Sequence, residues 1–344
     1  MLPIPAGEFW VGTHNATYDH EENPRFRTRV AAFCADETEV TTAAYEGCVK
    51  GGACRATDTK NKTCNSSQKG RGDHPINCLD FDQAVAVCAA RGARLPDEVE
   101  WEYLARGGAE MRNFSWGKES PDGRACWKHH QSCAVKTYAP GAFGLYDVAG
   151  NVWEWTESWF SPHPWPAVTG QRRVVKGGGW SRRFDKWLVP TLRNREKPSQ
   201  TGSHLGVRCV LTLPDVRCPS GQPDNGRCPR QIEEVDCLDG RRWNGARCAS
   251  ERDAERCAPG THEEPGRGCV REIVAVSAET ALDLAAVTRA PSPEFDADCQ
   301  ANQPTRPHAY RYSGGEHLAR NAVGSAAGCK NRDVGVGWNS ACCP

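Results

Sequence analysis

Nineteen cysteines are the feature of this 344-residue sequence that most constrains its fold. So many thiols are a liability in a reducing cytosol, whereas in an oxidising compartment they form disulfides. No two cysteines have the Cys-x-x-Cys spacing of zinc ribbons and thioredoxin-type sites. We therefore expect a secreted, periplasmic or cell-surface protein with many disulfides. Because the count is odd, at least one thiol is expected to be free or bonded outside the chain.

The charge balance and hydropathy exclude several classes of protein. Basic and acidic residues both number 43, so the net charge is zero and the chain as a whole is not built to bind nucleic acid. No apolar run approaches the ~18 residues that a membrane helix needs, so we expect no transmembrane segment. A secretory signal should accompany so many disulfides. None precedes the domain-like sequence at Met1, which leads us to expect a processed or trimmed form.

The cysteines and tryptophans divide the chain into three expected parts, 1–214, 215–270 and 271–344. Nine of the cysteines and ten of the 12 tryptophans lie before residue 214, so the large aromatic core belongs there. Glycine (34) and proline (23) are frequent, which predicts many turns and few long helices. The first part is expected to be an irregular α/β domain with little regular secondary structure, and the rest a small disulfide-rich C-terminal extension.

Three helices are predicted in the first part. Asp80 begins a capping box, and Gly92 is the expected C′ residue that stops its helix. A second capping box begins at Asp97, and its helix should stop at Gly107. A third helix should run from Thr41 through Val49.

Residues 216–270 repeat a short cysteine-containing unit. Cys218, Cys237 and Cys257 are 19 and 20 positions apart, and each is followed by a second cysteine after a polar, glycine-containing stretch. Units of this length cannot bury a core, so each needs a covalent staple. We expect one disulfide-stapled hairpin per unit, with bonds between neighbouring units as the alternative. The array is more typical of spacer modules than of a ligand-binding array.

The last part offers little chemistry. Residues 273–287 have the pattern of a strand followed by a helix. Cys342 and Cys343 are adjacent, and because a bond between neighbours is strained we expect separate partners for them.

The segment 144–159 has the highest density of candidate functional groups. Asp147 and Glu154 flank a bend that contains Gly150, and three tryptophans follow closely. Calcium takes six to eight oxygen ligands, commonly carboxylates together with backbone carbonyls exposed in a loop. The spacing is compatible with a calcium site. It is more typical of a buried aromatic turn whose acids cap backbone N–H groups.

At this point the sequence resembles the formylglycine-generating enzyme, or sulfatase-modifying factor, superfamily. Eight blocks match in order over residues 1–210, about three-fifths of the chain. They are Ile4 to Gly12, Glu39 to Tyr45, His74 to Asn77, Arg94 to Tyr103, Phe114 to Gly117, Gly144 to Trp155, Lys176 to Trp180, and Leu205 to Cys209. The resemblance implies a looped α/β fold related to C-type lectins. It does not extend to residues 216–344.

The resemblance also implies one calcium site and one long-range disulfide. The implied calcium ligands are the side chains of Asp147 and Glu154 and the carbonyls of Gly150 and Val152. A second calcium site of the family does not carry over, because Ala125 occupies its side-chain position and the following loop is short. We expect a Cys126–Cys133 bridge to brace that loop instead. The family's disulfide between helix and last strand maps to Cys88 and Cys209, whereas a second family bridge falls on Ala105 and Leu192 and is lost.

One departure from the family decides the expected function. The family's oxidase chemistry needs two cysteines that hold copper, because Cu(I) prefers soft sulfur ligands. Those positions fall on Arg182 and Trp187, and the family's active-site serine falls on Gly179. No cysteine lies between Cys133 and Cys209. We therefore expect neither bound copper nor formylglycine production.

The replaced site is basic and aromatic. Residues 171–208 carry ten basic side chains and two acids, and aromatic residues are interleaved with them. Arginine forks beside aromatic faces suit anionic, glycan or protein ligands. The alternative is that tryptophans fill a vacated cavity while the arginines are solvated. The candidate groove comprises Gly179, Trp180, Arg182, Arg183, Phe184 and Trp187.

The expected function is thus a secreted, calcium-stabilised binding or scaffold module rather than an enzyme. The competing hypothesis is a non-haem metal-dependent oxidase of the same superfamily that works without the thiol pair. His204, Glu157 and Arg182 are its polar candidates. His129 and His130 are adjacent, so they point apart and make a poor metal pair.

Overall fold

The computed structural model describes residues 1–14, 20–57, 61–162, 169–213, 232–237, 241–244, 248–249, 262–264 and 268–270. The segment 273–287, Cys342 and Cys343 lie outside the described residues. The strands are short: β1 (Leu2–Ile4), β2 (Gly7–Val11), β3 (Arg25–Val30), β4 (Phe33–Ala35), β5 (Trp153–Trp159), β6 (Arg173–Lys176), β7 (Asn194–Glu196), β8 (Leu205–Gly206), β9 (Val210–Thr212), β10 (Glu234–Asp236), β11 (Arg242–Trp243), β12 (Cys248–Ala249), β13 (His262–Glu264) and β14 (Gly268–Val270).

The three predicted helices are present, and their ends are set by the predicted caps. In α2 (Phe81–Ala89) and α3 (Glu98–Arg106), the capping boxes at Asp80 and Asp97 are complete, and α3 stops at Gly107 in the left-handed conformation. Helix α1 (Thr42–Lys50) is capped by the Thr41 side chain. Gly92 stops α2 as its expected C′ residue: its φ is 66°, its amide donates to the Ala89 carbonyl at 2.9 Å, and the Ala93 amide donates to the Cys88 carbonyl at 2.9 Å.

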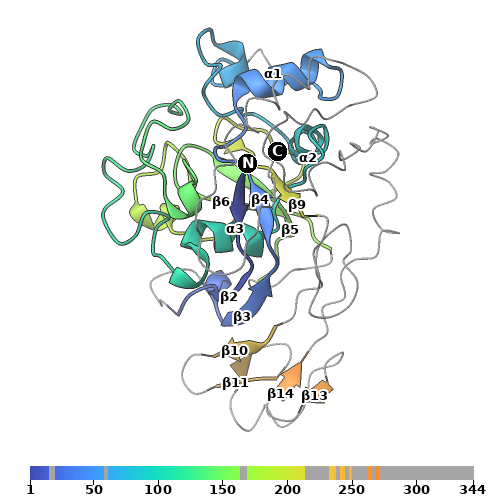
Figure 1. Cartoon of the computed structure of the whole chain (residues 1–344), viewed down its shortest axis with the longest axis vertical. Coiled ribbons are helices and arrows are strands. Elements are labelled where there is room, and N and C mark those ends of the chain that lie inside the picture. The colour runs from blue at the N-terminus through green and yellow to red at the C-terminus, as the bar shows by residue number, and fades with distance from the viewer. Residues whose placement is uncertain are drawn as a thin grey trace, which may run out of the picture.

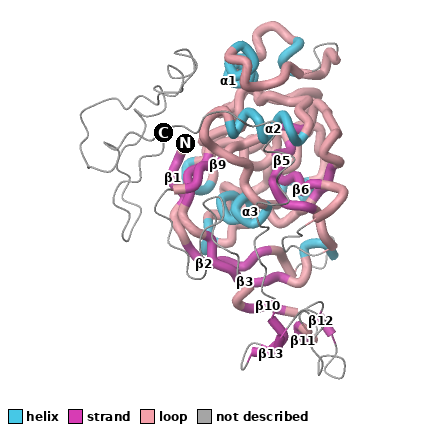
Figure 2. Tube along the Cα trace, turned by 90° about the vertical axis from the view of Figure 1, so that its right-hand side faces the viewer, coloured by secondary structure: helices cyan, strands magenta, loops and turns pink. Residues whose placement is uncertain are grey.

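The largest sheet carries the candidate site. Its order is β7-β6-β5-β8, and β5 pairs antiparallel with β6 and parallel with β8. Glu154 faces Lys176 across the β5–β6 ladder. Two three-stranded sheets, β1-β4-β9 and β10-β3-β2, complete the domain. In both views α3 lies centrally, between β2 and β3 below and α2 above (Figures 1 and 2).

The core contains two groups of buried apolar side chains. One includes Trp153 and Trp155 of β5 together with α2, and the other includes Trp101 of α3 together with β2, β3 and β4. All three tryptophans are fully buried. Strand β5 and helix α3 therefore place three indoles close to the loop that carries the candidate calcium ligands.

Disulfides tie these elements together. Cys88 of α2 bonds to Cys209 just before β9, the pairing expected from the resemblance. Cys126 bonds to Cys133, also as expected. Two further bridges are Cys48–Cys54 and Cys64–Cys78, and Cys34 is disulfide-bonded as well. In residues 1–213, every cysteine that the structure describes is therefore oxidised.

The described part of the extension contacts the N-terminal sheet. Strand β10 adds to β3, so the acidic residues of β10 lie beside a basic strand, and the Arg25–Asp236 ion pair is 2.6 Å long. Hairpins β11–β12 and β13–β14 lie beyond β10 (Figure 1). Cys237 bonds to Cys248, which is the expected staple within one repeat unit. Cys218, Cys228 and Cys257 lie outside the described residues.

No helix among the described residues is both long and apolar enough to cross a membrane.

Candidate functional site

The loop from Asp147 to Glu154 has an unusual backbone. Asp147, Gly150 and Asn151 all have positive φ, at 56°, 91° and 55°. A side chain at Gly150 would not fit, because an added Cβ would lie 2.7 Å from the Cys126 carbonyl oxygen. Asp and Asn are the non-glycine residues that adopt this conformation most readily, and contacts with other elements hold them in it.

Asn151 supplies much of that restraint. Its side chain, fully buried, donates to Glu39 Oε2 at 2.7 Å and accepts from the Cys133 amide at 3.0 Å. Its backbone N–H donates to Cys126 O, and its carbonyl accepts from the Trp180 amide. Asn151 thus connects the candidate calcium loop, the Cys126–Cys133 loop and the glycine-rich segment after β6.

Glu154 forms a buried ion pair with Arg208. The closest contact, Nη2 to Oε1, is 2.9 Å, and both side chains are almost completely shielded from solvent. Trp101 Nε1 donates to the other oxygen, Oε2, at 2.6 Å. Arg208 also donates to the carbonyls of Asp36 and Tyr146, which satisfies the rest of its guanidinium.

Acidic groups outnumber basic groups around this loop. Burial raises the pKa of Glu39 well above its usual value, and the carboxylates of Asp147 and Glu154 raise it further. Burial also raises the pKa of Asp147. Arg208 opposes both shifts. Three buried or half-buried carboxylates with one buried guanidinium are an environment that a bound cation would stabilise.

The implied calcium ligands fit this environment unequally. Asp147 Oδ2 accepts from the Lys136 amide at 2.7 Å, and among the described residues its other oxygen has no hydrogen-bond donor. Within the described chain, the carbonyl oxygens of Gly150 and Val152 also have no hydrogen-bond donor. These oxygens are free to bind a cation. Glu154 is already engaged by Arg208 and Trp101, so it is the least available of the four expected ligands.

The glycine-rich segment after β6 brings together the side chains at the two expected thiol positions. The Arg182 guanidinium carbon lies 4.8 Å from the ring centre of Trp187 and 5.4 Å from that of Trp153. The two indoles meet edge to face with centroids 6.3 Å apart. We call Trp153, Arg182 and Trp187 the arginine–tryptophan cluster.

Two donors in this cluster are buried without a partner. Within the described residues, neither Trp153 Nε1 nor Arg182 Nε has a hydrogen-bond acceptor. The contrast with Trp155 and Trp180 is clear, since their indole N–H groups donate to the carbonyls of Leu79 and Ser203. Burial lowers the pKa of Arg182, while the carboxylate of Glu196 counteracts this.

The other expected groove residues lie at different depths. Gly179 is buried, and Trp180 is half-buried. Arg183 and Phe184 are exposed, Phe184 to 68 %. The residues at the thiol positions therefore lie deeper than the exposed pair that follows Arg182.

The ten basic residues of 171–208 do not form one surface. Lys176, Arg193 and Arg208 are buried and form ion pairs with Glu102, Glu98 and Glu154. The Arg173 guanidinium lies 3.4 Å from the Trp159 ring centre. Counting charges along the sequence therefore overstates the positive charge of this region, because it ignores the acids that pack against the basic side chains from other elements.

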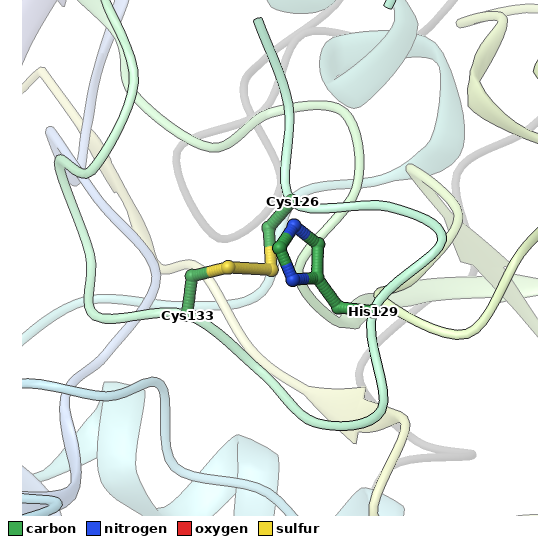
Figure 3. A group of neighbouring side chains, drawn as sticks. All are labelled: Cys126, His129 and Cys133. Carbon is green, nitrogen blue, oxygen red and sulfur yellow. A yellow bond between two sulfur atoms is a disulfide. The ribbon is translucent and has the colours of Figure 1, made fainter. Parts of the chain in front are cut away.

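The described residues contain one group of three possible soft-metal ligands, Cys126, His129 and Cys133, whose ligand atoms lie within 4.8 Å of one another. Figure 3 shows the His129 ring beside the Cys126–Cys133 disulfide. Because each sulfur is bonded to the other, neither is a thiolate ligand in this state. His129 Nε2 instead lies 3.2 Å from the Tyr138 hydroxyl.

This disulfide loop also supports the arginine–tryptophan cluster. The amide of Lys128 donates to the Arg182 carbonyl at 3.0 Å, and the amide of His129 donates to the Trp180 carbonyl at 2.8 Å. The brace expected at Cys126–Cys133 therefore reaches the segment that follows Gly179.

The polar candidates of the oxidase hypothesis are not brought together as one group. His204 Nε2 lies 3.7 Å from Glu196, and burial lowers the pKa of this histidine. The side chain of Arg182 acts electrostatically on His204. Glu157 is exposed, and its carbonyl accepts from Arg173. Of the three candidates, His204 and Arg182 are neighbours.

Sequence reasoning missed Glu39 and the partnerless N–H of Trp153. Glu39 belongs to one of the matched sequence blocks, but its contact with Asn151 spans 112 positions, so spacing could not indicate it. Nothing in the sequence distinguishes the indole of Trp153 from that of Trp155, two residues away.

Comparison with known proteins identifies the family to which this chain belongs. Residues 1–213 match the family model of the sulfatase-modifying factor enzyme 1-like domain, and the chain belongs to this family. Its relatives include both active and inactive members, so membership by itself does not decide activity.

Three relatives illustrate this. The chain is 30 % identical over 278 residues to the formylglycine-generating enzyme of Streptomyces coelicolor, covering 61 % of this chain and 88 % of that protein. It is 28 % identical over 280 residues to the formylglycine-generating enzyme of Bos taurus, covering 61 % and 74 %. It is 27 % identical over 267 residues to the Bos taurus inactive C-alpha-formylglycine-generating enzyme 2, covering 61 % and 87 %.

Solved structures share the fold. PvdO from Pseudomonas aeruginosa matches with a TM-score of 0.55 and 24 % identity, covering 61 % of this chain and 93 % of that one. Treponema denticola variable protein 1 matches with a TM-score of 0.51 and 22 % identity, covering 61 % and 94 %.

Proposed function

We propose that this protein is a binding member of its family that does not generate formylglycine. The observation that carries the proposal is the pairing of its thiols. Arg182 and Trp187 stand where the family's thiols are expected, and every described cysteine in residues 1–213 is in a disulfide. Copper chemistry through a thiolate pair then has no thiolates to use.

The ligand surface of this proposal is the arginine–tryptophan cluster together with its exposed neighbours Arg183 and Phe184. An arginine fixed against aromatic faces suits an anionic, glycan or protein ligand. The disulfides fit a secreted, periplasmic or cell-surface protein. A single calcium ion bound by the side chains of Asp147 and Glu154 and the carbonyls of Gly150 and Val152 would stabilise this loop. The C-terminal repeats would serve as a spacer or interaction module, and the domain would share its ancestry with C-type lectins.

The test is an aldehyde assay. Purified full-length protein is incubated with Cu(I), oxygen and a cysteine-containing peptide, and aldehyde is detected by mass spectrometry after hydrazide labelling. The Streptomyces coelicolor relative is the positive control. We expect no aldehyde above the level of peptide alone; its formation would refute the proposal.

A double substitution, Arg182→Cys with Trp187→Cys, provides a gain-of-function control. We expect it to bind Cu(I), whereas the unchanged protein does not, because only the variant presents two adjacent thiols. The non-haem oxidase hypothesis predicts instead that the unchanged protein consumes oxygen with bound iron and a small aromatic substrate. Oxygen uptake dependent on added Fe(II) would favour that hypothesis.

A further inference from the structure

We propose that Cys126, His129 and Cys133 form a zinc site that opens when the bridge between the two cysteines is reduced. In the oxidised protein the two sulfurs are bonded to each other. A dithiol reductant breaks this bond by exchange: the reductant becomes a disulfide, and two electrons and two protons pass to the two cysteines. Zinc then displaces both thiol protons and is bound by two sulfurs and the His129 ring, with water as the fourth ligand.

The first argument is the distance between the possible ligand atoms. The two sulfurs and a ring nitrogen of His129 all lie within 4.8 Å of one another, and Figure 3 shows the ring beside the bridge. Ligand atoms around a tetrahedral zinc are ~3.5–3.8 Å apart. The Cα atoms of Cys126 and Cys133 are 6.0 Å apart, so rotation of the reduced side chains can bring the sulfurs to that separation. The other four bridges that the structure describes in full have no third ligand of this kind.

The second argument is that the backbone holds the three residues without help from the bridge. The Cys126 carbonyl accepts from the Asn151 amide at 2.8 Å, and the Cys133 amide donates to Asn151 Oδ1 at 3.0 Å. The His129 amide donates to the Trp180 carbonyl at 2.8 Å. None of these hydrogen bonds involves sulfur, so all three ligands keep an anchor after reduction. A site held in this way binds an ion without the cost of ordering a loop.

The third argument is the orientation of the histidine. His129 Nε2 lies 3.2 Å from the Tyr138 hydroxyl, which leaves Nδ1 as the nitrogen for the ion. A hydrogen bond at the outer nitrogen fixes the ring and the tautomer of zinc-bound histidines. His129 is exposed, so an ion can reach the ring from solvent.

The fourth argument is the access of a reductant to the bridge. Among the cysteines of residues 1–213, Cys133 alone is half-buried, and the others are buried. Exchange requires a thiolate to approach one sulfur of the bridge, so buried bridges react slowly. The bridge also spans only 7 positions, so chain entropy protects it less than it protects Cys88–Cys209, which spans 121.

The first experiment measures which bridge opens first. Full-length protein is treated with increasing concentrations of dithiothreitol, free thiols are alkylated, and labelled cysteines are identified by peptide mapping. We expect Cys126 and Cys133 to be labelled at a lower concentration than the buried bridges of residues 1–213. Earlier labelling of a buried pair such as Cys48 and Cys54 would overturn the proposal. Failure to label Cys126 and Cys133 before the protein unfolds would overturn it as well.

The second experiment measures zinc binding by the mildly reduced, full-length protein after dithiothreitol has been removed without oxygen. Zinc is titrated against a chromogenic chelator, with calcium in excess so that zinc does not enter the candidate calcium loop. We expect the reduced protein to bind one more zinc ion per chain than the oxidised protein does. Cobalt(II) in its place should produce a thiolate charge-transfer band. Equal zinc binding by the two forms would overturn the proposal.

Substitutions assign the ligands. His129→Gln should weaken zinc binding by the reduced protein at least about tenfold, because a ligand is lost. His130→Gln, at the exposed neighbouring position, is the matched control and should leave the affinity unchanged. Equal affinity in the two variants would refute the role of His129. The double variant Cys237→Ala with Cys248→Ala removes another half-buried bridge. Loss of zinc binding in this double variant would place the ion there instead and overturn the proposal.

This inference goes beyond the proposed function and fails separately from it. The proposed function concerns the oxidised protein, so absence of zinc binding after reduction would leave it standing. Aldehyde formation would refute the proposed function whatever the zinc titration shows.

Discussion

The buried side-chain amide of Asn151 donates to Glu39 across 2.7 Å, although the two residues are 112 positions apart in the sequence. The other oxygen of Glu39 accepts from the Val152 amide at 3.1 Å. A carboxylate from the segment before α1 therefore holds two consecutive residues of the candidate calcium loop. This contact explains how Asn151 can keep a positive φ.

Replacing this amide should destabilise the protein. In Asn151→Ala, Glu39 loses one of its two donors while still buried, and an unsatisfied buried group costs about 1–3 kcal/mol. We expect a loss of that size in the free energy of unfolding, measured by urea denaturation. Asn113→Ala, at an exposed position, is the control and should change little. Equal stability of the two variants would show that the Asn151–Glu39 contact carries no net energy.

Removal of calcium should lower the melting temperature. A ligand present at 100 times its dissociation constant stabilises the folded state by about 2.7 kcal/mol, which corresponds to several degrees for a domain of this size. We expect EDTA to lower the melting temperature, calcium to restore it, and Asp147→Asn to reduce the response. Asp122→Asn, at an exposed position, is the control. A melting temperature unaffected by EDTA, together with no calcium by elemental analysis, would remove the proposed site.

The long-range disulfide should contribute more stability than a local one. Cys88 and Cys209 are 121 positions apart, whereas Cys48 and Cys54 are separated by 6. In the chain-entropy model the first closes a loop worth about 4–5 kcal/mol and the second about 2 kcal/mol. In denaturant titrations, we expect the double variant Cys88→Ala with Cys209→Ala to lose more free energy of unfolding than the double variant Cys48→Ala with Cys54→Ala. The reverse order would show that native-state strain or residual structure dominates.

His74 should make stability depend on pH. Burial lowers the pKa of His74 below its usual value, and Arg71 lowers it further. The unfolded state therefore binds the His74 proton more readily than the folded state does. The folded state keeps its full stability above the pKa that His74 has in the unfolded state, and it loses stability as the pH falls below that value. We expect His74→Gln to flatten the decline in stability between pH 7.5 and 5. His130→Gln, at an exposed position, should leave the decline as it is.

Cys34 should link the domain to the later part of the chain. It is disulfide-bonded, and the other eight cysteines of residues 1–213 bond to one another. We therefore expect non-reducing peptide mapping to recover a Cys34 peptide joined to one from beyond residue 213. Recovery of Cys34 as a free thiol, or joined to a second copy of itself, would contradict this prediction.

Local signals in the sequence were sufficient for the helices. Capping by Thr41, Asp80 and Asp97 depends on residues three positions apart, so the starts of α1, α2 and α3 could be predicted. The end of α2 could be predicted as well, because Gly92 takes the left-handed conformation that a C′ glycine allows. The matched sequence blocks indicated the family and the Cys88–Cys209 pairing.

Long-range contacts explain most of what sequence reasoning missed. Glu39, Glu98 and Glu102 are far in sequence from the side chains they contact, Asn151, Arg193 and Lys176. Tertiary packing alone decides which of the ten basic side chains in residues 171–208 are neutralised. The same holds for Trp153, whose free N–H is apparent only once the surrounding carbonyls are placed.

The pairing of β10 with β3 affects whether one copy of this protein can pair with another through a strand edge. Strand β3 pairs with β2 on one side, and on the other side β10 pairs with Arg25, Phe26 and Arg27, so β10 covers the first half of that edge. Proteolysis that removes residues after 213 would bare one of those sides, and a bare strand edge is a template for neighbouring molecules. The pairing of β10 therefore covers part of a strand edge that could otherwise pair with a second copy of the chain.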